Sequence, residues 1–371
     1  MKAIGIVLFF VSLCGAASFA GGAGPLGEEL VFRGASDASA AAAIAEDMFI
    51  VADDENNVLR VYRAGEGGPP VSSYDLTAFL GIDPEYPEAD IEGATMIGQR
   101  IYWITSHGRN KDGKIRPNRY RFFATDVRVN DGSVTVQPVG TPCRTLVHEL
   151  LRTGTADRLG LAKATRFDAR DLKKKDREKL APKEDGLNIE ALCGSPDGKT
   201  IYIGFRNPRV VDRASRGSRA IVAPLRNADR VVERRAAPAF GEPMLWDLAG
   251  LGVRSMEYSR AHGAYFIVAG SSDGDDKYAL YRWSGQRNAP PVKVGELSWD
   301  KSKFTPEALV PFANSGRFLL LSDDGSLLIK VTGPHECLDG EYRKDGTCEN
   351  KYLADPAKKT FRGVWLELPP P

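Results

Sequence analysis

A short phrase built around a glutamate recurs along the sequence and is followed each time by the same series of features. It reads DIEGAT from Asp90, LNIEAL from Leu187, RSMEYS from Arg254 and FTPEAL from Phe304. After each phrase come a turn, an apolar run rich in β-branched and aromatic residues, polar turn residues and a further strand-like stretch. Residues 35–63 follow the same scheme without the glutamate. The chain therefore contains five similar units.

Units of roughly forty to fifty residues built from four short strands are typical of a β-propeller. We therefore predict an all-β fold with five blades, although a sixth blade hidden in residues 140–186 stays open. The last unit lacks an outer strand, whereas residues 27–34 have strand character and precede the first unit. We expect this N-terminal strand to close the ring beside residues 361–368, because closure hides sheet edges.

Residues 145–185 differ from the repeats, since they are charged, favour helix and contain no strand pattern. We interpret them as a helical insertion that extends into solvent. Its basic residues between Lys173 and Lys179 alternate with acidic ones, which favours a solvated face over a nucleic-acid patch. The whole chain has 50 basic and 49 acidic residues, and 27% of its residues are charged. This near-neutral balance argues against disorder and against a nucleic-acid partner.

The first twenty residues have the layout of an export signal. Lys2 precedes an apolar run, and small residues lead to Ser18-Phe19-Ala20. We expect cleavage after Ala20, a mature single domain of residues 21–371 with no membrane span, and a periplasmic or secreted monomer.

Four cysteines remain in the predicted mature chain: Cys143, Cys193, Cys337 and Cys348. An even number in an exported protein indicates two disulfides. Cys337 and Cys348 bracket part of a charged loop, residues 334–360, and form the natural local pair. Cys143 would then pair with Cys193, but four cysteines allow three pairings and the sequence leaves the choice open.

The repeated glutamates are the first candidates for a site. In an antiparallel blade, the start of the first strand lies beside the end of the second, so the glutamates should gather at one mouth of the channel. Crowded carboxylates repel one another unless they share a cation or a proton, which predicts a site for Ca²⁺ or another divalent cation. The alternative is that each glutamate accepts backbone N–H groups of the adjoining blade. The candidate ligands are Glu92, Glu190, Glu257 and Glu307.

The turns at the same mouth add residues that differ between blades. His107 is a candidate general base, and its alternative role is a turn histidine bonded to a backbone carbonyl. Arginine-rich loops follow the second strands of two units, and guanidinium groups bind phosphate or carboxylate in pairs. The same arginines could instead neutralise the acidic ring. The candidate residues for binding an anionic ligand are Asp53, Arg109, Asn110, Arg206 and Asn207.

Longer stretches of the chain resemble a known family of exported bacterial proteins. The stretches are DIEGAT from Asp90, residues 102–126, APKEDGLNIEAL from Ala181, IYIGFRNPR from Ile201 and RAIVAPLRN from Arg219. They resemble the domain-of-unknown-function family 3616, which implies a β-propeller and no particular activity. Through the Asp/Asn, aliphatic, Glu phrase alone, the chain is also distantly similar to propeller proteins described as phytase-like or esterase-like.

Two functions from different classes fit this pattern. The first is a metal-assisted hydrolase of a phosphoester or ester, in which the glutamates hold the cation, His107 acts as base, and Arg109 and Arg206 hold the anion. The second is a non-catalytic propeller that binds a small anionic ligand or a protein partner. The fold does not decide between them, so the sequence leaves open whether the protein is an enzyme.

Overall fold

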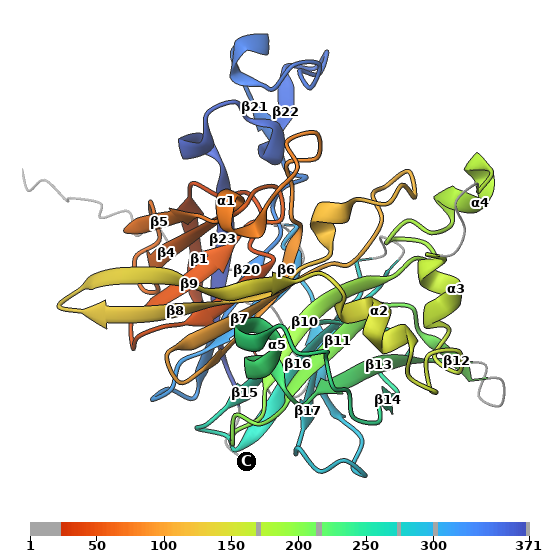
Figure 1. Ribbon diagram of the computed structural model, residues 1–371. Coiled ribbons are helices and arrows are strands. Elements are labelled where there is room, and N and C mark those ends of the chain that lie inside the picture. The colour runs from red at the N-terminus through yellow and green to blue at the C-terminus, as the bar shows by residue number, and fades with distance from the viewer. Residues whose placement is uncertain (1–23, 168–171, 213–216, 273–275, 300–302, 369–371) are drawn as a thin grey trace, which may run out of the picture.

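The computed structural model describes residues 24–167, 172–212, 217–272, 276–299 and 303–368 (Figure 1). The predicted export signal, residues 1–20, lies outside these ranges. Within them, antiparallel sheets form a five-bladed β-propeller, which confirms the all-β prediction. The described part of residues 140–186 does not form a sixth blade.

The first two blades are sheets of four consecutive strands that run in order from the channel to the outside. Blade 1 consists of β2 (Ala40–Ala43), β3 (Met48–Ala52), β4 (Val58–Arg63) and β5 (Ser72–Asp75). Blade 2 consists of β6 (Ile91–Ile97), β7 (Arg100–Thr105), β8 (Phe122–Asn130) and β9 (Ser133–Cys143).

Blade 4 repeats this arrangement, whereas blade 3 has a divided outer edge. Blade 3 consists of β10 (Asn188–Gly194), β11 (Ile201–Asn207) and β13 (Gly217–Leu225), with β12 (Val210–Asp212) and β14 (Met244–Trp246) pairing with different parts of β13. Blade 4 consists of β15 (Gly252–Ser259), β16 (Ala264–Gly270), β17 (Tyr278–Trp283) and β18 (Val292–Leu297).

Blade 5 joins the two ends of the chain. It consists of β19 (Pro306–Pro311), β20 (Arg317–Ser322), β23 (Thr360–Glu367) and, outermost, β1 (Gly24–Arg33). Phe32 of β1 lies opposite Phe361 of β23, as the closure prediction requires. Their rings stack with centroids 5.0 Å apart and both contact Tyr62 of blade 1. The closing strand is therefore held by aromatic packing as well as by backbone hydrogen bonds.

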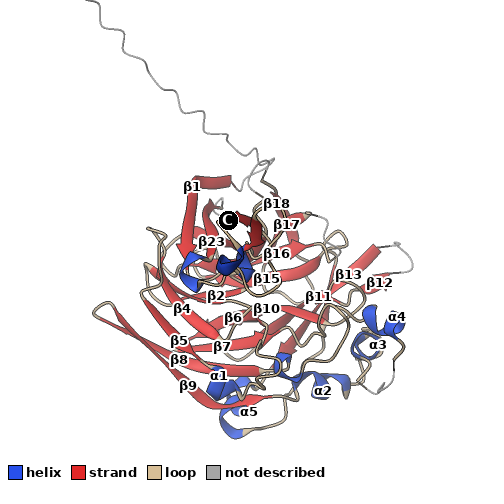
Figure 2. Cartoon of the chain, turned by 90° about the horizontal axis from the view of Figure 1, so that it is seen from above, coloured by secondary structure: helices blue, strands red, loops and turns tan. Residues whose placement is uncertain are grey.

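The hydrophobic core is divided into layers between neighbouring blades. The layer between blades 1 and 2, for example, contains Ile50 and Val61 together with Ile91 and Trp103. Similar clusters fill the four other interfaces. The inner strands contact one another in the cyclic order β2, β6, β10, β15 and β19. In the view from above, β2, β6, β10 and β15 lie around the centre (Figure 2). This arrangement brings the starts of all five inner strands together.

The helical insertion packs more closely than the sequence predicts. Helices α2 (Leu146–Leu151) and α3 (Leu161–Thr165) bury apolar side chains, including Leu150 and Leu161, in the layer between blades 2 and 3. Only α4 (Lys174–Glu178) has no buried residue and matches the expected solvated helix. Two further short helices, α1 (Thr77–Leu80) and α5 (Ala228–Arg234), lie in connections of the propeller. No helix in the described ranges is long and apolar enough to cross a membrane.

The four cysteines are free thiols, so neither expected disulfide is present in this structure. Cys143 ends the outer strand β9, whereas Cys193 is buried in the inner strand β10, and this separation explains why they do not pair. Cys337 and Cys348 share a small cluster with Leu353 in the segment around β21 (Leu328–Lys330) and β22 (Thr347–Glu349). This segment projects from one face of the propeller (Figure 1).

Candidate functional site

A cavity of about 990 Å³ lies where the starts of the five inner strands meet. Asp37 of the first unit, Glu92 of β6, Glu190 of β10, Arg254 of β15 and Glu307 of β19 all line it. The cavity-lining residues include twelve acidic and nine basic side chains, so acids are in excess. The expected gathering of strand starts at one channel mouth therefore gives a charged cavity.

A backbone irregularity directs one residue of each inner strand in blades 2 to 5 into this cavity. The strand register shifts at Glu92 in β6, at Glu190 in β10 and at Arg254 in β15, and in β19 it shifts within the pair Glu307-Ala308. Such bulges re-aim the side chain of the extra residue and are frequent beside functional sites. In blades 2, 3 and 5 the bulge therefore coincides with the glutamate of the repeated phrase or includes it.

In the phrase RSMEYS, the residue equivalent to the glutamate of the other three phrases lies three residues before Glu257. Val253 pairs with Ala269 as Ile189 pairs with Phe205, so Arg254 occupies the position of Glu190. Glu257 lies further along β15, opposite Phe266, and is not among the cavity-lining residues. Burial raises the pKa of its carboxyl well above the ordinary value. The spacing to the end of the second strand does not reveal this register, because Glu257 lies as far from the end of β16 at Gly270 as Glu92 lies from the end of β7 at Thr105.

Two of the glutamates bind arginine side chains. Glu190 Oε1 accepts hydrogen bonds from Arg206 Nη1 and Asn188 Nδ2, both at 2.7 Å. Glu307 pairs with Arg254, whose Nε lies 3.7 Å from the second oxygen of Glu190. Arg254 of blade 4 therefore lies between glutamates of blades 3 and 5. The partners of these two glutamates in the described part of the chain are side chains, not the backbone N–H groups of the alternative interpretation.

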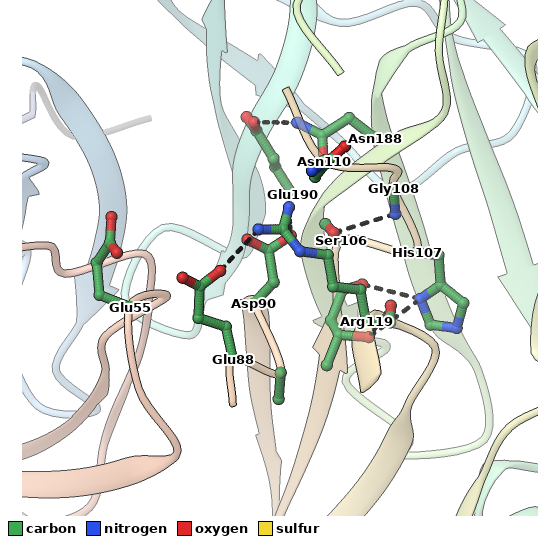
Figure 3. Close-up of polar contacts among 12 residues, drawn as sticks. Glu55, Glu88, Asp90, Ser106, His107, Gly108, Asn110, Arg119, Asn188 and Glu190 are labelled. Carbon is green, nitrogen blue, oxygen red and sulfur yellow. Dashed lines mark hydrogen bonds and ion pairs between the residues drawn. The ribbon is translucent and has the colours of Figure 1, made fainter. Parts of the chain in front are cut away.

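A second acidic group lies between blades 1 and 2. Asp54, Asp90 and Glu92 each offer an oxygen, and the three oxygens lie within 4.8 Å of one another. Arg119 pairs with Asp90 at 3.0 Å and with Glu88 at 2.9 Å, as Figure 3 shows. Glu92 also belongs to a similar group with Glu190 and Glu307. Glu92 therefore connects two adjacent groups of carboxylates.

Burial makes the ionised forms of these carboxyls costly. It raises the pKa of Glu92 well above the ordinary value, and the charges of Asp90 and Glu190 raise it further, while Arg254 and Arg206 oppose the rise. Burial likewise raises the pKa of Asp54, with Glu55 and Glu92 adding to the effect. The pKa of Asp37 is raised by burial and by Asp323, with which it shares a side-chain hydrogen bond. These groups need a proton or a cation to compensate their charge.

Several buried polar atoms of the cavity lack hydrogen-bond partners in the described structure. Four of them are oxygens: Asp37 Oδ1, Asp54 Oδ1, Asn188 Oδ1 and Glu190 Oε2. One is a donor, Arg254 Nε. Buried polar groups in proteins are nearly always satisfied, so an excess of unsatisfied oxygens indicates an occupant that attracts oxygen ligands.

His107 lies outside this cavity. It is 1% exposed, and its Nδ1 lies 2.9 Å from the carbonyl oxygen of Thr105, which matches the turn interpretation (Figure 3). Its backbone has φ of 51°, in the left-handed region. Burial lowers the pKa of the ring to about 4. The geometry therefore gives no support to His107 as the general base.

Two of the predicted anion-binding residues line the cavity, and the other three bind to loops around it. Arg206 and Asn110 line the cavity. Arg109 instead donates to carbonyl oxygens of Gly113, Thr165 and Arg166. Asn207 donates to carbonyl oxygens of Pro182 and Glu184, and Asp53 accepts from the backbone N–H groups of Ser36 and Glu55. These three hold loops in place.

Sequence reasoning missed several charged residues that line the cavity. Asp54 and Asp90 adjoin residues that were singled out, but nothing in the sequence shows which of two neighbouring acids faces inward. Arg119 comes from the long connection between β7 and β8, and Lys351 reaches Glu55 at 2.8 Å from the projecting segment. Such approaches from distant loops have no signal in the local sequence. The sequence placed Asp54, Glu55, Arg119 and Asp323 near the channel mouth without assigning them a role, and the residues that it missed are Asp37, Glu88, Asp90, Asn188, Arg254 and Lys351.

Comparison with protein families confirms the resemblance inferred from the sequence. Residues 160–314 match the family described as protein of unknown function (DUF3616). The phrases from Ala181, Ile201 and Arg219 lie within this match, whereas DIEGAT and residues 102–126 lie outside it. A comparison with curated proteins found no match.

Among solved structures, similar chains include a glutaminyl cyclase of Myxococcus xanthus, at 10% identity and a TM-score of 0.44, with 94% of this chain and 97% of that chain covered. Another is a putative oxidoreductase (glucose dehydrogenase) of Thermus thermophilus, at 11% identity, TM-score 0.41 and coverages of 91% and 100%. A third is the PQQ-bound aldose sugar dehydrogenase of Streptomyces coelicolor, at 10% identity, TM-score 0.39 and coverages of 93% and 100%.

Proposed function

We propose that the cavity binds a divalent cation, with Ca²⁺ as the first choice, and uses it to hold a small anionic ligand. The observation that supports this most directly is the set of four buried cavity oxygens that have no hydrogen-bond donor among the described residues. A neutral organic ligand would need a separate hydrogen-bond donor for each of these oxygens, whereas a single hard cation satisfies several oxygens at once.

The ligands that we assign to the cation are Asp54, Asp90 and Glu92. Their oxygens lie within 4.8 Å of one another, and two oxygens on opposite sides of a Ca²⁺ ion are about 4.8 Å apart. Glu190 and Glu307 are engaged by arginines, so they are less available to a cation. Asn188 Oδ1 and Asp37 Oδ1 are further oxygens that line the cavity.

The anionic ligand would lie toward the arginines of blades 3 and 4. Arg206 and Arg254 line the cavity, and Arg254 Nε is a buried donor that has no hydrogen-bond acceptor within the described residues and lies 3.7 Å from Glu190 Oε2. A bound cation would add positive charge on the opposite side, and an anion between them would be attracted by both.

The reaction class that such an arrangement supports is hydrolysis of a phosphoester or an ester. A divalent cation lowers the pKa of bound water and polarises the oxygen of the scissile group, while guanidinium groups stabilise negative charge in the transition state. A buried carboxylate of the cavity would accept the proton of the attacking water, because no histidine is among the cavity-lining residues of the described chain.

A non-catalytic binding propeller is the second candidate. It is favoured by the position of His107, whose ring is buried outside the cavity. Binding of a cation and an anion without turnover would fit the same charges.

Metal content and thermal unfolding test the cation site. We expect purified protein to contain a stoichiometric divalent cation, and a chelator to lower the unfolding temperature in a way that added Ca²⁺ reverses. Glu92→Gln should abolish this response. Glu257→Gln is the matched control, because Glu257 also lies on an inner strand but does not line the cavity. Protein without bound metal and without a response to Ca²⁺ or Mg²⁺ would refute the proposal.

Catalysis needs a separate assay. Turnover of small aryl phosphates or aryl esters that depends on the cation, and that Glu92→Gln removes, would favour the hydrolase. Saturable binding of an anion such as phosphate, measured with cation present and without any turnover, would favour the binding role.

We also infer that the chain acts outside the cytoplasm, on the strength of the signal pattern in residues 1–20. Sequencing the N-terminus of the protein from a periplasmic fraction should give Gly21 first. In that oxidising compartment we expect Cys337 and Cys348 to form a disulfide, because both lie in the same small cluster. Thiol titration should then find two more free thiols in the reduced protein than in the exported protein.

A further inference from the structure

Arg254 interrupts a series of glutamates at equivalent positions. The bulged residue of the inner strand is a glutamate in blades 2, 3 and 5 and an arginine in blade 4. The Arg254 residue is 5% exposed, so its charge is almost entirely withdrawn from solvent. A buried guanidinium is costly unless carboxylates compensate it, and here Glu190 and Glu307 do so.

The carboxylates beside Arg254 resemble a second cation site. Glu92, Glu190 and Glu307 offer oxygens within 4.8 Å of one another, as Asp54, Asp90 and Glu92 do. Glu190 is 3% exposed and Asn188 is 4% exposed. Within the part of the chain that the structure describes, Glu190 Oε2 and Asn188 Oδ1 have no hydrogen-bond partner. Both residues line the cavity. Carboxylate spacing and unsatisfied buried oxygens thus point independently to a cationic occupant.

From this geometry we infer that the cavity has two adjacent cation positions that share Glu92, and that Arg254 fills the second one. The native protein accordingly binds one divalent cation, on the Asp54 side. Arg254 acts as a specificity-determining residue, because it limits the number of cations that the cavity binds. The cation position on the Asp54 side rests on the proposed function, whereas the role of Arg254 in the second position follows from its own contacts.

Counting bound cations tests this inference. The variant Arg254→Met keeps the length of the side chain and removes its charge, which leaves Glu92, Glu190 and Glu307 free to bind a cation. We expect one Ca²⁺ per chain in the native protein and two in Arg254→Met, measured by calorimetric titration and by elemental analysis after dialysis. Arg206→Met is the matched control, since it also removes a partner of Glu190 but leaves Arg254 beside Glu307. It should still bind one cation.

Four outcomes separate the inference from the proposed function. One cation in the native protein and two in Arg254→Met support both. One cation in each overturns the inference alone. None in the native protein and one in Arg254→Met overturns the first position but supports the second. No cation in either protein overturns both.

A second variant covers the case in which Arg254→Met does not fold. In the native background, Glu307 binds Arg254 and not the cation, so Glu307→Gln should change the Ca²⁺ affinity by less than about tenfold, which is about 1.4 kcal/mol. Asp90→Asn should weaken it by more than that. A loss of Ca²⁺ binding in Glu307→Gln as large as in Asp90→Asn would show that the second carboxylate group holds the cation, and the inference would be wrong.

Discussion

Replacing Asp37 with asparagine should stabilise the metal-free protein at neutral pH and have little effect in acid. Asp37 is 7% exposed, and burial together with Asp323 raises its pKa well above the ordinary value. In the unfolded chain the same carboxyl ionises with a pKa of about 3.9. Above that pH the native state keeps a proton that the unfolded state releases, so the stability of the wild type falls as pH rises toward the native pKa.

The size of the effect follows from the proton linkage. Each pH unit over which native Asp37 stays protonated costs about 1.4 kcal/mol relative to asparagine, which cannot ionise. The advantage of Asp37→Asn therefore grows as pH rises above about 4.5 and levels off once pH passes the native pKa. For a chain of this size, about 1.4 kcal/mol corresponds to a shift of about 2 °C in the unfolding temperature, so the difference between the two proteins should widen by about 2 °C per pH unit.

The assay is thermal unfolding of wild type and Asp37→Asn in the presence of a chelator at several pH values above about 4.5. The difference between the two proteins reports on the Asp37–Asp323 pair, because these two carboxyls share a hydrogen bond and titrate together, whereas titrating groups away from this pair are common to both proteins. A difference that does not change with pH, or a variant that becomes relatively less stable as pH rises, would refute the assignment of Asp37 as a buried, proton-bearing carboxyl.

Other residues give simpler tests. His107 has a pKa lowered to about 4, so its native state resists protonation below pH 6.5 and wild-type stability should fall as pH drops from 6.5 to 4, by about 1.4 kcal/mol per unit. Asparagine tolerates the left-handed backbone at this position, so His107→Asn should fold and should remove this pH dependence of stability in urea unfolding. The metal content of the variant should be unchanged. A loss of metal would show that His107 belongs to the site. Phe361→Ala should cost about 3 to 5 kcal/mol, because Phe361 is fully buried between Phe32 and Tyr62. A loss below about 1 kcal/mol would show that aromatic packing does not hold the closing strand.

The propeller itself could be predicted from the sequence because its determinants are local and repeated. Each unit carries its own strand pattern and turns, so five copies of one pattern imply five similar sheets. The closure of blade 5 was also accessible, since residues 27–34 and 361–368 were the strand-like segments left without partners. Glu92, Glu190, Glu307 and Arg206 could be placed at the channel mouth by strand topology alone.

The composition of the site was decided by tertiary structure. The bulges that aim Glu190 and Arg254 inward are shifts of one residue in strand register, and a pattern of apolar residues does not determine such shifts. The buried positions of His107 and Arg109, and the approach of Arg119 to Asp90, depend on how long loops fold over the blades. The repeats determined where a cavity would form, because they place every inner strand around one axis. The identity of its charges depended on contacts between residues far apart in the chain, and these exist only after the blades have closed into a ring.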